Sequence, residues 1–292
     1  MVLASLLFAL MGVCVKFASA QYSAGEIVLY RGALGALLMA GVTRARGGTL
    51  RTPVPAMHFW RSLTGVCALC LWFYSIGRLP LATAMTLNYM SSVWMALFLI
   101  GGAVALGGAR VDARLVCTVL VGFAGVAMVL RPAIERDQVW GGLAGLLSGV
   151  LAAMAYLQVT ALGRVGEPEH RVVFYFSLAG AVAGALLAPL TGGLHGHTLV
   201  GVTLLVAVGL LATAAQWMMT RAYGAGATLV NASLQYTGIA WSFIFGVLLF
   251  DDPVTLLALA GMALISGAGI AATRLRGRAT APDAANSAIV DS

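Results

Sequence analysis

The 292-residue chain is 61% hydrophobic and only 9% charged, with a mean hydropathy of +0.95. A soluble domain carries about 25% charged residues, so this composition excludes a protein whose main solvent is water. A membrane-spanning helix needs roughly 20 apolar residues. Such spans and their connections account for nearly the whole chain and leave no room for a soluble catalytic domain.

The first apolar run, residues 2–20, can be interpreted in two ways. It ends in Ala18-Ser19-Ala20, which mimics the cleavage site of a secretory signal peptide. However, no positive charge precedes the run, and Lys16 lies within it. These two features favour a first membrane span over a cleaved signal.

Ten apolar runs follow one another along the chain, separated by short polar or glycine-rich breaks. We place the spans at residues 2–20, 26–43, 57–77, 81–106, 114–131, 140–163, 171–190, 198–222, 226–250 and 254–273. The tail at residues 274–292 is polar and rich in Ala and Ser, which is typical of disorder.

The arginines indicate how the spans are oriented. With the N-terminus in the cytoplasm, twelve arginines, Arg61 among them, fall in cytoplasmic connections and ends, and three fall on the opposite side. Cytoplasmic loops of membrane proteins are enriched in Lys and Arg, so both termini are expected in the cytoplasm. The net charge of +7 then reflects topology and does not indicate a nucleic-acid partner.

The second half of the chain repeats the first when the sequence is shifted by 145 residues. The aromatic residues that coincide are Tyr30 with Tyr175, Trp72 with Trp217, and Phe98 with Phe243. Five spans per half make the two copies lie upside down relative to each other, which is typical of secondary transporters. The sequence therefore predicts an all-α polytopic membrane protein whose ten transmembrane helices form two inverted five-helix repeats. We place the repeats at residues 1–131 and 140–273, with a linker at residues 132–139.

Three stretches resemble the drug/metabolite transporter superfamily in its ten-span EamA branch. Arg78-Leu-Pro-Leu-Ala-Thr-Ala-Met-Thr-Leu-Asn88 and Tyr223-Gly-Ala-Gly-Ala-Thr-Leu-Val-Asn231 are similar to its small-residue entry into spans 4 and 9. Phe245-Gly-Val-Leu-Leu-Phe-Asp-Asp252 resembles its LLxE ending, with Asp in place of Glu. That family often carries a proline midway along these two spans, where this chain has Val93 and Gly238.

Within this branch, the chain is most similar to the aromatic amino acid exporters of the YddG type. The resemblance implies export of amino acids or related metabolites across the inner membrane of a bacterium.

Polar side chains gather on the fourth and ninth predicted spans. Asn88, Ser91 and Ser92 share one helix face, and Asn231 and Gln235 share another, because residues three or four apart lie on the same side of a helix. Buried amides need polar partners, so we expect them to contact either a substrate cavity or a neighbouring helix. The sequence leaves these two alternatives open.

Aromatic side chains on the spans could stack on an aromatic or cationic substrate. The candidates are Trp72, Tyr74, Tyr89, Trp94, Tyr156, Trp217 and Tyr236. The alternative for each of them is ordinary packing or anchoring at the membrane interface. The Trp72 and Trp217 pair is the strongest candidate, because both lie inside spans at equivalent positions of the repeat.

Lys16 and Arg31 are predicted as the two basic residues well within spans, where an ionisable group is costly unless it is paired or hydrated. Each could hold a substrate carboxylate, or could pair with Glu26 or extend to the interface. Gln158 is a further candidate donor.

Several chemistries lack a sequence signal. No Asp or Glu lies deep in a predicted span, so a proton-relay carboxylate has no candidate, and no phosphate-binding loop is present. Cys67 and Cys70 form a CxxC within a span, and His195 and His197 lie two residues apart in a loop. Both patterns are weak signals of a metal site, so we expect neither a metal nor a cofactor.

The leading interpretation is a monomeric carrier in the lipid bilayer that exports aromatic or bulky neutral amino acids by alternating access. One rival is an exporter of cationic drugs, which would need a buried acid. A second is an intramembrane enzyme, which would need a nucleophile–base pair or metal ligands within the spans. A third is a lipid flippase or a non-transporting membrane protein.

Overall fold

The computed structural model describes residues 1–105, 136–225, 234–257, 259–268, 270 and 271, together with 117, 121, 122, 124, 125, 128, 231 and 274. Regular secondary structure within these residues is entirely helical. The predicted span at residues 114–131, the linker and most of the tail lie largely outside the described residues. The first part of the predicted span at residues 226–250 lies outside them as well.

The helices begin and end close to the predicted boundaries. They are α1 (Val2–Ala18), α2 (Ala24–Ala45), α3 (Pro55–Arg78), α4 (Leu81–Tyr89), α5 (Ser91–Ala105), α7 (Arg136–Arg164), α8 (Glu169–Leu187), the short 3-10 helix η2 (Pro189–Thr191), α9 (Leu199–Gly224) and α11 (Thr237–Phe250). A further apolar helix covers Leu259–Ala268. Five helices, α2, α3, α7, α8 and α9, are long and apolar enough to cross a membrane.

The predicted span at residues 81–106 is two helices rather than one. Helix α4 ends at Tyr89 and α5 begins at Ser91, with a tight turn in which the Val93 N–H donates to the Met90 carbonyl at 2.9 Å. Before α11, the Ile239 N–H donates to the Tyr236 carbonyl at 3.0 Å in the same three-residue pattern. Both turns form without a proline.

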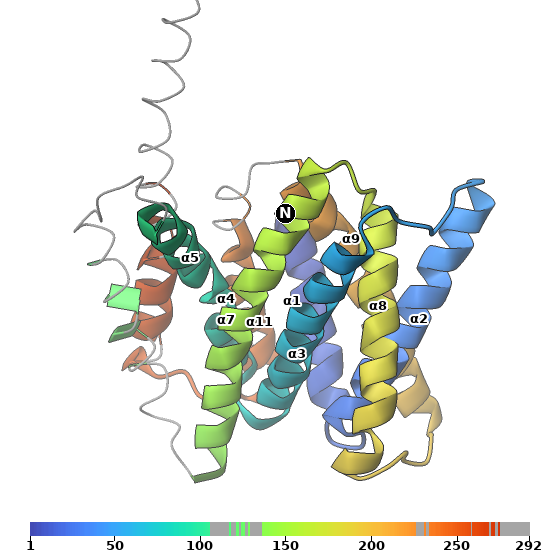
Figure 1. Ribbon diagram of the computed structural model, residues 1–292. Helices are drawn as coiled ribbons and strands as arrows, with labels where there is room; N and C mark the ends of the chain where they lie inside the picture. The colour runs from blue at the N-terminus through green and yellow to red at the C-terminus, as the bar shows by residue number, and fades with distance from the viewer. Residues whose placement is uncertain are drawn as a thin grey trace, which may run out of the picture.

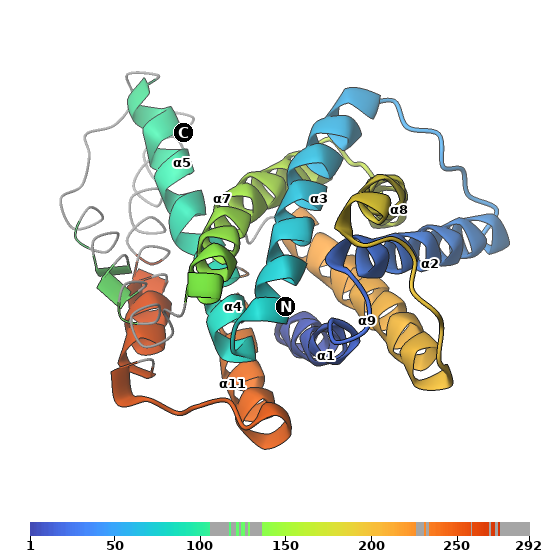
Figure 2. The same cartoon turned by 90° about the horizontal axis from the view of Figure 1, so that it is seen from below.

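The helices pack in pairs that join the two predicted halves. Helix α2 packs on α8, α3 on α7, α1 on α9, and α4 on α11. Figures 1 and 2 show these helices as one bundle, in which α1 and α7 run in opposite directions along its axis.

The crossing of α2 and α8 depends on glycines. A Cβ added at Gly32 would collide with the backbone of Ser177 and Ala181, and one at Gly184 would collide with the backbone of Leu29. Small residues let helix backbones approach closely in a membrane, where burial of apolar surface provides little driving force.

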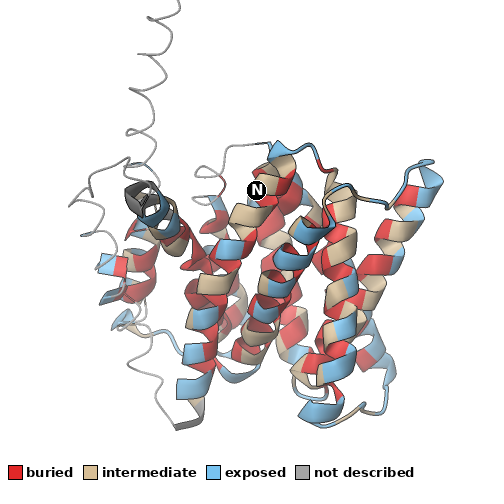
Figure 3. Cartoon of the chain, viewed as in Figure 1, coloured by how far each residue is buried: buried red, intermediate tan, exposed pale blue. Residues whose placement is uncertain are grey.

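Burial distinguishes the inside of the bundle from its outside. Buried residues face the bundle axis, and the outward faces are exposed (Figure 3). Large apolar side chains remain on those outer faces; Leu37 is 71% exposed and Leu186 is 68% exposed. Exposed apolar surface of this kind suits contact with lipid rather than with water.

Candidate functional site

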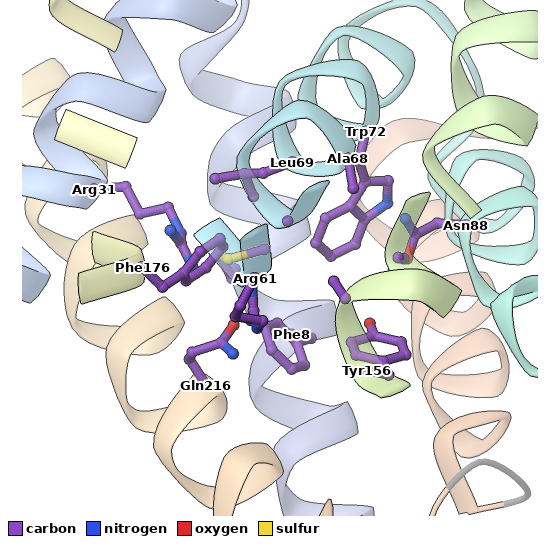
Figure 4. A pocket seen from close by; sticks show the side chains of 14 residues that line it. Phe8, Arg31, Arg61, Ala68, Leu69, Trp72, Asn88, Tyr156, Phe176 and Gln216 are labelled. Atoms are coloured by element: carbon purple, nitrogen blue, oxygen red, sulfur yellow. The ribbon is translucent and has the colours of Figure 1, made fainter. Parts of the chain in front are cut away.

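A small cavity lies inside the bundle, between helices of both predicted halves. We call it the inner cavity; it is lined by Phe8, Met11, Arg31, Arg61, Gly65, Ala68, Leu69, Trp72, Asn88, Ala152, Ala155, Tyr156, Phe176 and Gln216 (Figure 4). Its volume is about 50 Å³, which is room for a few waters rather than for a whole amino acid. A substrate the size of an amino acid therefore does not fit in this conformation.

Two arginines reach the inner cavity from neighbouring helices. Arg31 on α2 is 3% exposed and Arg61 on α3 is 2% exposed. In both side chains, Nε and Nη1 are buried and have no hydrogen-bond partner among the described residues. The Cζ atoms of Arg31 and Arg61 lie 4.9 Å and 4.2 Å from the centroid of the Phe176 ring. Both cations are thus stabilised by the same aromatic ring.

The position of Arg61 depends on a glycine one turn further along α3. Side chains four residues apart share a helix face, so the Arg61 side chain passes over Gly65. A Cβ added at Gly65 would collide with Nη1 of Arg61 and would lie 3.0 Å from the Phe176 ring. Gly65 therefore leaves the space in which the guanidinium lies against Phe176.

Two more N–H donors of the inner cavity lack an acceptor. Within the described part of the chain, Nε1 of Trp72 and Nε2 of Gln216 have no hydrogen-bond partner, and both side chains are buried. None of the described residues that line the cavity is Asp or Glu. The cavity therefore presents positive charge and N–H donors, which suit an anionic ligand or one rich in acceptor oxygens.

Four of the predicted site residues meet at the inner cavity. They are Arg31, Trp72, Asn88 and Tyr156. The Asn88 amide donates to Ser148 Oγ at 3.0 Å, which orients Asn88 from across the interface between α4 and α7. The Trp72 ring packs edge-on against Phe8 with centroids 6.2 Å apart.

Gln235 lies next to the inner cavity but does not line it. Its Nε2 donates to the Tyr156 hydroxyl at 3.2 Å, and its Oε1 accepts from the Tyr223 hydroxyl at 3.2 Å. The rings of Tyr156 and Tyr223 stack with centroids 5.2 Å apart. Gln235 thus holds a cavity residue, Tyr156, in place.

The remaining polar candidates of the fourth and ninth predicted spans are absent from the lining. The Asn231 amide donates to the Ala222 carbonyl at 2.6 Å and so connects two segments of the second half. Ser91, Ser92 and Tyr236 are buried close to the breaks before α5 and α11.

Three further candidates contact other side chains outside the inner cavity. The Trp217 ring faces Arg46, whose Cζ lies 5.8 Å from the ring centroid. Tyr74 faces Arg78 at 5.0 Å in the same way. Gln158 accepts a hydrogen bond from Thr64 at 2.8 Å, in the contact between α3 and α7.

Lys16 pairs with Asp252 and not with Glu26. Its Nζ lies 2.9 Å from Oδ1 of Asp252, whose Oδ2 accepts a hydrogen bond from the Leu81 N–H at 2.8 Å. Glu26 is fully buried in the first turn of α2 and lies 2.9 Å from Nδ1 of His195. The alternative in which Lys16 or Arg31 pairs with Glu26 is therefore wrong.

Arg61 is the site residue that the sequence analysis missed. We had placed it among the cytoplasmic connections, whereas the structure places it in the second turn of α3, buried at the inner cavity. The signal was present, because Arg61 falls within the predicted span at residues 57–77. With Arg61 assigned to the interior, eleven arginines remain on the predicted cytoplasmic side and three on the opposite side.

A larger hollow lies between α3 and α8, on the outside of the bundle. This groove has a volume of about 670 Å³ and includes the exposed side chains of Phe59, Leu63, Leu178 and Leu186. Such an apolar surface suits a hydrocarbon chain of the bilayer, so the inner cavity is the better candidate for binding a polar solute.

Comparisons with known proteins decide the family. The model of the EamA-like transporter family matches residues 1–131. The pseudopaline exporter CntI of Pseudomonas aeruginosa is 33% identical over 277 residues, which are 94% of this chain and 95% of the exporter. The chain belongs to the EamA-like transporter family. The predicted membership of the drug/metabolite transporter superfamily is thereby confirmed.

This EamA-like transporter has other bacterial relatives. An uncharacterized transporter of Helicobacter pylori is 25% identical, covering 92% of this chain and 91% of the relative. A riboflavin transporter of Rhizobium johnstonii is also 25% identical, over 77% and 73% of the two chains. A solved crystal structure at 21% identity covers 94% of this chain and 96% of its own, with a TM-score of 0.66, so the two share a fold.

Proposed function

We propose that this EamA-like transporter exports an amino acid or a related metabolite from the bacterial cytoplasm by alternating access. The substrate is aromatic or bulky and binds in the inner cavity. The observation that carries this proposal is the buried guanidinium of Arg31, whose Nε and Nη1 have no hydrogen-bond partner among the described residues, at a cavity that Trp72 and Tyr156 also line. A carboxylate can accept from the guanidinium while an apolar side chain packs on the rings.

The packing of the helices supports two inverted halves. In the predicted repeat, α1, α2 and α3 of the first half correspond to α7, α8 and α9 of the second. The contact of α1 with α9 therefore corresponds to the contact of α7 with α3, and the contact of α2 with α8 corresponds to itself. Both kinds of contact are present, and α1 and α7 run in opposite directions (Figure 1). This pattern is expected of two copies related by an axis in the membrane plane.

Polar side-chain contacts at opposite ends of the bundle suit alternating access. Lys16 and Asp252 join the two halves at one end, 2.9 Å apart, and His58 and Glu167 join them at the other, 3.1 Å apart. The inner cavity must widen to admit a substrate. Opening one end while the other stays closed would break one of these contacts at a time.

The inner cavity disfavours the rival exporter of cationic drugs. Such a carrier needs negative charge at its site, whereas the charged groups lining this cavity in the described structure are two guanidinia. The names of the pseudopaline exporter and the riboflavin transporter support transport of an organic solute. We place the protein in the inner membrane as a monomer, with both termini in the cytoplasm and without a cofactor.

Counterflow in proteoliposomes tests the proposal. We expect the purified protein to exchange at least one member of a panel of aromatic or bulky amino acids and related carboxylates, and Trp72→Ala to reduce the rate about tenfold. Trp60→Ala is the matched control, because Trp60 lies on the same helix but is 57% exposed on the outside. Failure of every member of the panel to exchange would contradict the proposal.

A further inference from the structure

The inner cavity carries more positive charge than its lining balances. Arg31 and Arg61 contribute two guanidinium groups, while Asp and Glu are absent from the described residues around the cavity. Buried charges without partners are costly, above all in a membrane interior. The missing negative charge is therefore expected from the ligand.

The other free polar atoms of the inner cavity point to the same chemistry. Nε1 of Trp72 and Nε2 of Gln216 are N–H donors, as are Nε and Nη1 of both arginines, and in the described structure these atoms lack acceptors. An ammonium group would meet the like charge of two guanidinia here, and the acceptors that the lining side chains offer are neutral amide and hydroxyl oxygens. A zwitterionic amino acid brings one such ammonium for each carboxylate, so it would leave both positive charges of the site in excess.

The two arginines provide a separate guanidinium group for each of two anionic groups. Arg31 comes from α2 and Arg61 from α3, and both guanidinia lie against Phe176. Figure 4 shows these three side chains together on one side of the cavity, and Trp72 and Tyr156 on the other. A guanidinium binds a carboxylate through two parallel hydrogen bonds, so two of them can bind two carboxylates.

We propose that the substrate is a dicarboxylate with an aromatic or otherwise apolar body, in which acidic groups outnumber basic ones. This inference rests on the proposed function and names its substrate class. The two carboxylates bind to Arg31 and Arg61, and the apolar body packs against Trp72 and Tyr156. Gly65 is a positioning residue, because it leaves the space that the Arg61 guanidinium occupies.

Binding of three related ligands to the full-length protein in detergent tests this substrate class. All three ligands carry a phenyl group. Benzylsuccinate has two carboxylates, 3-phenylpropionate has one, and phenylalanine is a zwitterion. A hydrogen-bonded charge pair changes affinity by about 10- to 100-fold. We expect benzylsuccinate to bind more tightly than either of the other two ligands by that factor, measured by ligand-induced thermal stabilisation.

Variants then test which residues cause the preference. Arg31→Gln and Arg61→Gln should each bring the affinity ratio of benzylsuccinate to 3-phenylpropionate close to one. Arg78→Gln is the matched control on α3, because Arg78 lies at the helix end beside Tyr74, and it should leave the ratio unchanged. Gly65→Ala should lower the ratio while keeping both charges, which provides the same test if Arg61→Gln fails to fold.

The outcomes separate this inference from the proposed function. Equal binding of the three ligands, or a preference for phenylalanine, would overturn the dicarboxylate. Counterflow of phenylalanine would in that case still support the exporter. If no ligand shows counterflow, the exporter fails, and the binding ratios still decide whether the cavity recognises two carboxylates.

Discussion

At the scale of single residues, Phe176 explains how two like charges can lie close together in a membrane protein. Both guanidinia lie within cation–π distance of its ring, at 4.9 Å and 4.2 Å from the centroid. The separation of the two Cζ atoms therefore cannot exceed the sum of these distances. The negative π face compensates part of the repulsion between the cations.

Replacing Phe176 by Leu should destabilise the protein by about 1–3 kcal/mol, because both cation–π contacts are lost while a buried apolar side chain remains. The measurement is the unfolding free energy in detergent. Phe174→Leu is the matched control on the same helix and should have a smaller effect. In a double-mutant cycle, Arg61→Gln should cost less in the Phe176→Leu background than in the native one. Purely additive effects would contradict the contact.

Polar, basic and aromatic side chains within predicted spans were the candidates that the sequence offered for the site. Arg31, Trp72, Asn88 and Tyr156 were predicted as site residues, and the structure brings all four to the inner cavity. Arg61 was missed because a charged residue near the start of a span is usually a flanking charge. Whether a long side chain points towards the interface or the interior depends on neighbours such as Gly65. The composition of the span does not predict that packing.

At the scale of elements, the sequence predicted where helices begin and end better than where they break. The break at Met90 lacks the proline that often marks one, and Ser91-Ser92 directly after it are a weaker local signal. It lies where α4 and α11 cross, and a Cβ added at Gly238 would lie 2.6 Å from the Tyr89 ring. The break is therefore associated with a contact between segments about 150 residues apart, which a local pattern does not show.

The crossing of α2 and α8 gives a prediction for two glycines of one helix. Gly32→Ala should lower stability by about 1–3 kcal/mol, since its Cβ would collide with the backbone of α8. Gly41→Ala is the matched control, because a Cβ there meets nothing within 4 Å. In an open helical position alanine stabilises by about 0.5–1 kcal/mol relative to glycine. Thermal unfolding of both variants measures the contrast, and equal shifts would argue against the close crossing.

At the scale of the whole molecule, charge placement and helix packing lead to one topology. The structure joins the connection after α2 to the start of α8, because Nε of Arg171 donates to the Thr49 carbonyl at 2.8 Å. These basic segments thus lie at one end of the bundle. The end of α8 that precedes Leu194 lies at the opposite end of the bundle (Figure 1). Burial alone cannot orient the bundle, because exposed residues lie at both of its ends (Figure 3), so the orientation depends on the positive-inside bias.

Cysteine labelling of intact cells tests this orientation. In a background with the four native cysteines replaced by Ala, Leu194→Cys should react with a membrane-impermeant maleimide from outside, because Leu194 is 66% exposed and the proposed orientation places its loop in the periplasm. Thr49→Cys should react only after the inner membrane is permeabilised, because its exposed connection carries the arginines that remain in the cytoplasm. Val165→Cys, 57% exposed in the connection before α8, should behave like Thr49→Cys although it belongs to the other half. Reaction of Thr49→Cys and Val165→Cys on opposite sides would contradict the inverted arrangement, since that arrangement places an odd number of spans in each half.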